Sequence, residues 1–141
     1  MIDIENKVIT NIETAFSQWD SKPRVVSVLP RDEAYPAVVY VRMLDNSTYQ
    51  NSLDNSLKEH HARISFRIEC YSNAIKEAKS EVKAMLQEVD NAMQNMKFTR
   101  TSYNFIPNIN PSYTRAYADY YAIVQEPVTV GKNQVYRMYR K

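Results

Sequence analysis

The chain has 141 residues, a length typical of a single folded domain. Hydrophobic residues make up 44% of it and charged residues 24%, which is ordinary for a globular protein and argues against disorder. The formal net charge is only +2, from 18 basic and 16 acidic residues of interspersed sign, so we expect no basic surface of the kind that binds duplex nucleic acid.

Residues with special chemistry are scarce. Cys70 is the only cysteine, which excludes an intramolecular disulfide and leaves too few ligands for the usual zinc sites. Gly131 is the only glycine, so glycine-rich phosphate loops and dinucleotide fingerprints are excluded. His60 and His61 are neighbours, and in a strand their rings point to opposite faces, where they do not share a metal. We therefore expect no enzyme activity, no metal and no cofactor.

The sequence favours a protein made and used in the cytoplasm. It has no run of about 18 apolar residues of the kind that spans a membrane. It begins Met1-Ile2-Asp3-Ile4-Glu5, with acids where a signal peptide carries bases. The eleven tyrosines are unusual, and tyrosine is enriched where proteins meet.

The first predicted elements are a helix and two strands. Apolar residues recur every three or four positions from Asp3 to Trp19, which predicts an amphipathic helix. Val25 to Leu29 and Ala37 to Met43 read as short strands bounded by prolines. We expect these two strands to form a hairpin through residues 31–35.

A polar segment follows at residues 44–59. It is rich in Asn and Ser and has no sustained hydrophobic period, which predicts a long loop. Loops of this length in compact domains are often functional, although a plain surface excursion remains the alternative.

The second half carries the clearest patterns. From His61 to Tyr71 apolar and polar residues alternate strictly, which predicts a strand with one buried face. Ser72-Asn73 offers a helix cap, and an apolar stripe from Ile75 to Met96 predicts a long amphipathic helix. Strands are predicted at Lys97 to Phe105 and Thr114 to Gln125, on either side of a proline-containing loop.

Together these elements predict an α+β fold. We expect a mainly antiparallel β-sheet of four to five strands with two α-helices packed on one face. Residues 1–127 would form the single domain, and residues 128–141 a basic and aromatic tail or an extra strand. Cys70 falls on the apolar strand face and is expected to be a core residue.

The polar strand faces and the tail are the candidate binding surfaces. Arginine and tyrosine are typical of interaction hot spots, although an ordinary solvated sheet face fits the same pattern. The tail is expected to add a strand to a neighbouring subunit or, as the alternative, to bind single-stranded nucleic acid. The candidate subunit-interface residues are Arg63, Arg67, Glu69, Tyr71, Arg115, Tyr117, Asp119, Tyr121, Tyr136 and Tyr139.

The order of elements resembles the tail terminator, or tail completion, proteins of long-tailed bacteriophages. The resemblance covers nearly the whole chain and lies in element order and residue type, without a catalytic motif. Its segments are Tyr35-Pro36-Ala37-Val38-Val39-Tyr40-Val41, Ala62 to Tyr71, Met96-Lys97-Phe98-Thr99-Arg100, and Arg115 to Ala122. The family often has a glycine after its long helix, where this chain has Lys97 before Phe98.

The resemblance implies a structural virion protein without enzyme activity. Such proteins form a ring, usually of six subunits, at the head-proximal end of the tail, where it caps the tail tube and joins it to the head. The implied partners are further copies of the chain, the tail-tube protein and a head–tail connector protein, while DNA passes through the channel without sequence-specific binding. The polar loop would line the channel or touch the tube, with Asp45, Tyr49, Asp54 and Lys58 as candidates.

Two other functions remain open at this point. One is another head–tail joining or adaptor protein of the virion. The other is a nucleic-acid-binding α+β module that uses a tyrosine-rich sheet as a stacking platform.

Overall fold

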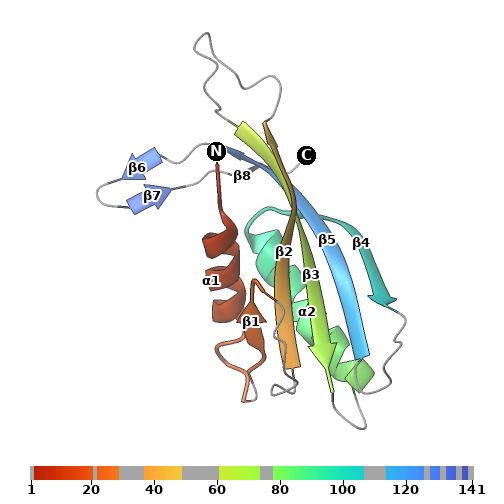
Figure 1. Ribbon diagram of the computed structural model, residues 1–141. Helices are drawn as coiled ribbons and strands as arrows, with labels where there is room; N and C mark the ends of the chain where they lie inside the picture. Colours follow the sequence, from red (N-terminus) through yellow and green to blue (C-terminus); the bar gives the residue numbers. More distant parts are fainter. Residues whose placement is uncertain are drawn as a thin grey trace.

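The computed structural model describes residues 2–20, 22–28, 37–48, 61–73, 78–106, 114–125, 128–130, 133–135 and 138–139, and it has an α+β fold (Figure 1). The elements in chain order are α1 (Glu5–Ala15), β1 (Arg24–Val26), β2 (Ala37–Thr48), β3 (His61–Ser72), α2 (Ala78–Asn95), β4 (Thr99–Ile106), β5 (Thr114–Gln125), β6 (Val128–Val130), β7 (Asn133–Val135) and β8 (Met138–Tyr139).

One twisted sheet forms the body of the molecule. Its strand order is β1-β2-β3-β5-β4, and β8 adds to β5. All neighbours in this order are antiparallel except β1 and β2. The mainly antiparallel α+β sheet expected from the sequence is therefore confirmed, with one parallel pair as an exception.

The predicted hairpin between the first two strands is wrong. Arg24 to Val26 pair with Val38 to Tyr40 in the parallel direction. Ten residues separate Val26 from Ala37, which is far more than the two-residue turn of a tight hairpin. The chain therefore has enough length to return along the strand before β2 begins.

β2 is longer than predicted, and part of the predicted loop is strand. Asp45 to Thr48 pair with Ser65 to Ala62 of β3, after a bulge between Met43 and Asp45. Asp, Asn and Ser have low intrinsic strand preference, but cross-strand pairing with the strongly alternating β3 overrides it. The remainder of the predicted loop lies outside the described residues.

Both helices cover the same face of the sheet. Figure 1 shows α1 and α2 on the same side of the sheet. Their buried side chains form a single cluster with the apolar residues of β2, β3 and β5. Phe66 of β3 meets Phe98 edge to face, with ring centroids 5.9 Å apart. Cys70 is fully buried in this cluster, in agreement with its predicted core role. Neither described helix is long and apolar enough to cross a membrane.

Lys97 occupies the position after α2 where glycine is usual. Lys97 has a φ of 67°, in the left-handed region that favours glycine. Phe98 N–H donates to the Met93 carbonyl and Lys97 N–H to the Gln94 carbonyl, both at 2.9 Å, which is the Schellman pattern of a helix end. Lys97 therefore adopts the glycine conformation at an energetic cost, and the turn itself is intact.

A buried polar contact joins α2 to the sheet. The Tyr120 hydroxyl donates to Asp90 Oδ1 at 2.8 Å, and both residues are buried. Gln94 donates to Asp90 Oδ2 at 2.7 Å, and Arg100 of β4 forms an ion pair with Asp90 Oδ1 at 3.2 Å. The carboxylate is thus hydrogen-bonded despite its burial, as buried charges must be.

Candidate binding face of the sheet

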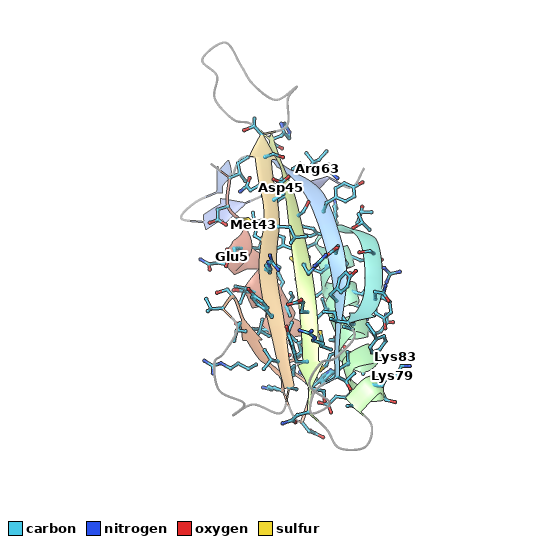
Figure 2. The ribbon with its side chains drawn as sticks, turned by 45° about the vertical axis from the view of Figure 1, so that its right-hand side comes forward. Glu5, Met43, Asp45, Arg63, Lys79 and Lys83 are labelled. Carbon is cyan, nitrogen blue, oxygen red and sulfur yellow. The ribbon has the colours of Figure 1, made fainter. Side chains whose placement is uncertain are left out.

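The sheet face turned away from the helices, called the open face below, carries the predicted interface residues of β3 and β5. In the antiparallel register Tyr71 lies opposite Arg115, Glu69 opposite Tyr117, and Arg67 opposite Asp119. Figure 2 shows this face with its side chains toward the viewer and the helices behind it. The structure therefore brings the predicted residues of both strands together, because side chains two residues apart share a face.

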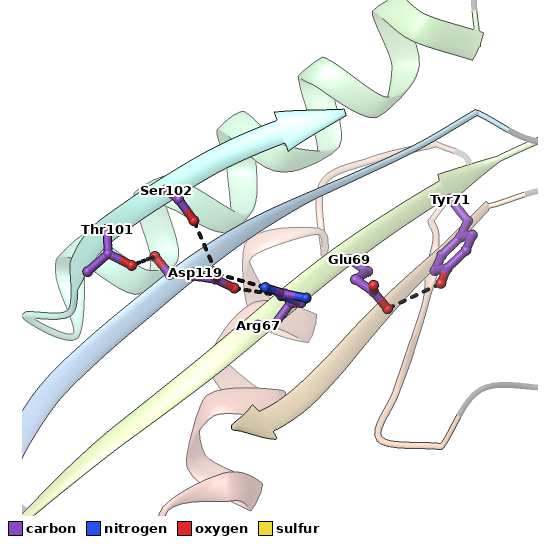
Figure 3. Close-up of polar contacts among 6 residues, drawn as sticks. All are labelled: Arg67, Glu69, Tyr71, Thr101, Ser102 and Asp119. Atoms are coloured by element: carbon purple, nitrogen blue, oxygen red, sulfur yellow. Dashed lines mark hydrogen bonds and ion pairs between the residues drawn. The ribbon is translucent and has the colours of Figure 1, made fainter. Parts of the chain in front are cut away.

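An ion pair lies at the centre of the open face (Figure 3). Arg67 donates from Nε to Asp119 Oδ1 at 2.8 Å and from a second guanidinium nitrogen to Oδ2 at 3.1 Å. Ser102 of β4 adds a hydrogen bond to Asp119 Oδ2 at 3.1 Å. The hydrogen bond from Arg67 lowers the pKa of Asp119, and the same bond raises the pKa of Arg67. Two-point pairing of this kind fixes the guanidinium plane.

Two arginines lie over tyrosine rings on the open face. The Arg67 guanidinium carbon is 4.3 Å from the centre of the Tyr117 ring, and that of Arg63 is 4.7 Å from the centre of the Tyr121 ring. Both distances are within the range of cation–π attraction. The long arginine side chains are therefore held against the sheet.

A second polar group surrounds Glu69. This carboxylate is only 9% exposed, and in the register it lies between Tyr40 and Tyr117. It accepts a hydrogen bond from the Tyr71 hydroxyl at 3.2 Å (Figure 3). Burial, followed by the charge of Glu69, raises the pKa of Tyr71. Among the described residues, the buried Nε of Arg115 has no hydrogen-bond partner.

Arg42 is an exposed cation on the same face. It lies directly opposite Arg67 in the register of β2 and β3, and like charges in this position repel. Within the described part of the chain Arg42 forms no ion pair: Asp119 is paired with Arg67, and Glu69 accepts a hydrogen bond from Tyr71. The open face can therefore accept a carboxylate from another molecule at Arg42.

Other predicted site residues fall elsewhere. Asp45 is on β2, not in a loop; it lies opposite Ser65 and accepts a hydrogen bond from Ser47 at 3.2 Å. Tyr139 belongs to β8 and lies opposite Ile123 of β5. The remaining candidates, Tyr49, Asp54, Lys58 and Tyr136, lie outside the described residues.

The sequence did not predict the Asp90–Tyr120 contact, nor a depression beside it. This depression has a volume of about 350 Å³ and is lined by Lys83, Leu86, Gln87, Asp90, Arg100, Tyr103 and Tyr120. The available signal was Tyr120 itself, since strand alternation places it on the buried face between Ala118 and Ala122. Asp90 is held by partners from three elements, which suits a role in packing.

No group of three or more potential metal ligands occurs in the ranges that the structure describes. No model of a known protein family matches the sequence, and a search among curated proteins also finds no match. A function for this chain must therefore be inferred from the geometry of the open face.

Proposed function

We propose that this chain is a structural subunit without catalytic activity, which acts by binding other protein chains through its open face. More specifically, we propose that the chain is a tail terminator of a long-tailed phage. Copies of the chain form a ring, of six subunits as in the resembling family, that caps the tail tube at the head-proximal end and joins it to the head connector. DNA passes through the ring without sequence-specific contacts.

The observation that supports this proposal is the order already present on the open face. Arg67 is held by an ion pair at 2.8 Å and by the Tyr117 ring, and Arg63 is held by the Tyr121 ring. Binding normally costs about 0.5–1.5 kcal/mol for each long side chain that it immobilises. Arginines that are already ordered avoid most of this cost, and arginine and tyrosine are the residue types that dominate protein interfaces.

The same contacts favour protein over single-stranded nucleic acid. A base that stacks on tyrosine needs an open ring face. On Tyr117 and Tyr121 one face is covered by a guanidinium group at 4.3 Å and 4.7 Å respectively. A nucleic-acid-binding module remains the second candidate, supported by the number of tyrosines on this face. Salt-dependent binding of an oligonucleotide at physiological ionic strength would replace our proposal with that one.

The first test is the mass of the chain in solution, measured by light scattering alone and with a tail-tube protein. We expect a ring in at least one of these conditions. A monomer in both conditions contradicts the proposal.

Variants then test the open face. Arg42→Glu reverses an exposed charge that forms no ion pair within the described residues, so the fold should persist while binding of the tail-tube or connector protein weakens by at least about tenfold. Tyr117→Ala and Arg115→Glu should act in the same direction. Lys83→Glu makes the same charge change on the exposed surface of α2 and serves as the matched control. Equal binding of these partners by Arg42→Glu, Tyr117→Ala and the control would mean that the open face is not the binding surface.

A further inference from the structure

Among the described strands, neither outer edge of the sheet is fully paired, although the Asn46 side chain donates to the Ile2 carbonyl at 2.7 Å beside β2. β1 covers β2 only at Val38 to Tyr40, so from Val41 to Ser47 no described strand lies on the outer side of β2. At the opposite edge, β4 pairs with β5 alone among the described strands. Each edge therefore presents a row of main-chain donors and acceptors of the kind that pairs with a further strand.

These edges carry exposed apolar side chains beside the charged residues Arg42, Asp45 and Arg100. Neither stretch contains the Lys or Pro residues that commonly block an open edge, although each has one bulge. Four large hydrophobic side chains are exposed in the described ranges, and three of them lie on these edges: Met43 at 36%, Leu44 at 42% and Tyr103 at 41%. Figure 2 labels Met43 on the outer border of β2. Exposed apolar groups beside an open edge favour a protein partner.

The strand directions show how two copies fit. β2 and β5 run one way, and β3 and β4 run the other way. If β2 of a second copy lies beside β4 of the first, with the helices of both copies on the same side, the new pair is antiparallel. The two edges are also similar in length, since β4 has eight residues and the open part of β2 is one residue shorter. The order β2-β3-β5-β4 can thus repeat from copy to copy with unbroken antiparallel pairing.

We propose that copies of this chain join edge to edge, with the Val41–Ser47 stretch of β2 in one copy pairing with β4 of the next. This contact covers Met43, Leu44 and Tyr103 in one interface. It is heterologous, because two different surfaces meet, and a heterologous contact of suitable rotation closes into a ring. Pairing of β2 with β2, or of β4 with β4, would stop at a dimer and leave the other edge exposed. The inference rests on the self-association in the proposed function and specifies how it occurs.

Blocked edges provide the test. Leu44→Lys and Tyr103→Lys each place a charge on one exposed edge position, and Ala84→Lys on the surface of α2 is the matched control. Each edge variant alone should lose the ring, with association weakened by at least about tenfold, while the control assembles as the wild type. An equimolar mixture of the two edge variants should form a one-to-one dimer and nothing larger, since each variant retains the edge that the other has lost.

Each other outcome is decisive. If both edge variants keep the wild-type mass, the edge pairing is wrong while the proposed function stands. If one variant alone still dimerises, the contact joins like edges. A wild-type chain that is monomeric throughout, with and without tube protein, overturns both proposals.

Hydrogen exchange of the wild type supplies a measurement without mutation. Amides of Val41–Ser47 and Thr99–Ile106 should become protected as protein concentration rises, and unchanged protection in the assembled state refutes the pairing.

Discussion

Replacing Lys97 with glycine should stabilise this protein. Lys97 has a φ of 67° at the end of α2, where the Schellman hydrogen bonds require the left-handed conformation. This conformation destabilises an L-residue with a Cβ by about 1–2 kcal/mol, but it does not destabilise glycine. Glycine is also more flexible in the unfolded chain, which reduces this gain in stability by about 0.5–1 kcal/mol. The free energy of unfolding should therefore rise by about 0.5–1 kcal/mol.

Thermal and urea unfolding followed by circular dichroism measure this change. For a domain of this size the gain corresponds to an increase in Tm of about 2–3 °C, with the urea midpoint moving in the same direction at an unchanged slope. All variants must be compared at one protein concentration, because self-association would also raise Tm.

Lys97→Ala is the matched control for the lost side chain. Lys97 is exposed, and alanine keeps the Cβ that causes the cost, so the control should stay within about 0.5 kcal/mol of the wild type. Equal stabilisation by alanine and glycine would assign the effect to the lysine side chain and refute the conformational argument. A glycine variant less stable than the wild type would refute it as well.

Three further predictions concern stability and reactivity. The Arg67 hydrogen bond lowers the pKa of Asp119 below its usual 3.8, so the ion pair stabilises the fold above about pH 4, and this stabilisation is lost as pH falls through the pKa of Asp119 in the folded protein. Asp119→Asn should therefore flatten the acid limb of a curve of unfolding free energy against pH. An unchanged acid limb would contradict this prediction. Tyr120→Phe removes a hydrogen bond to the buried Asp90 and should lower the free energy of unfolding by about 1–3 kcal/mol in urea titrations, whereas a neutral result would mean that Asp90 finds another donor. Burial raises the pKa of the Cys70 thiol, so an alkylating reagent at mildly alkaline pH should modify it only after unfolding, and rapid reaction of the folded chain would contradict its burial.

The sequence predicted which side chains share a face, but not which strands are neighbours. Strict alternation from His61 to Tyr71 and along Thr114 to Gln125 placed Arg67 and Asp119 on polar strand faces. The alternating pattern does not determine the register between strands. The 2.8 Å ion pair between Arg67 and Asp119 could therefore be found only from the observed strand order β3-β5-β4. Side-chain direction is a local property of a strand, whereas pairing is a property of the whole fold.

The errors arose where tertiary pairing outweighed local preference. The segment after Met43 reads as loop because Asp and Asn disfavour strands, yet it pairs with β3 as far as Thr48. Asp90 follows Val89 in the apolar stripe of α2 and was not singled out by the sequence pattern, but Tyr120 and Arg100 supply partners that allow its burial. Neither partner is near Asp90 in the sequence pattern, so only the folded arrangement reveals the contact.

The two proposed contacts are geometrically compatible. Edge pairing uses the borders of the sheet and leaves the open face and the outer surface of the helices free, so in a closed ring the helices form one wall and the open faces form the other. Charges of both signs lie on the open face: four arginines at positions 42, 63, 67 and 115, and the carboxylates Asp45, Glu69 and Asp119. A wall of this kind has nearly balanced charge and so little excess positive charge to hold DNA phosphates. If the open faces line the channel instead, Arg42→Glu should change neither the mass of the ring nor its binding of tube protein, and this result would contradict the binding proposed for the open face. If they bind the tube, the same variant should release the tube protein from an intact ring. Light scattering with and without tube protein therefore distinguishes the two orientations of the ring.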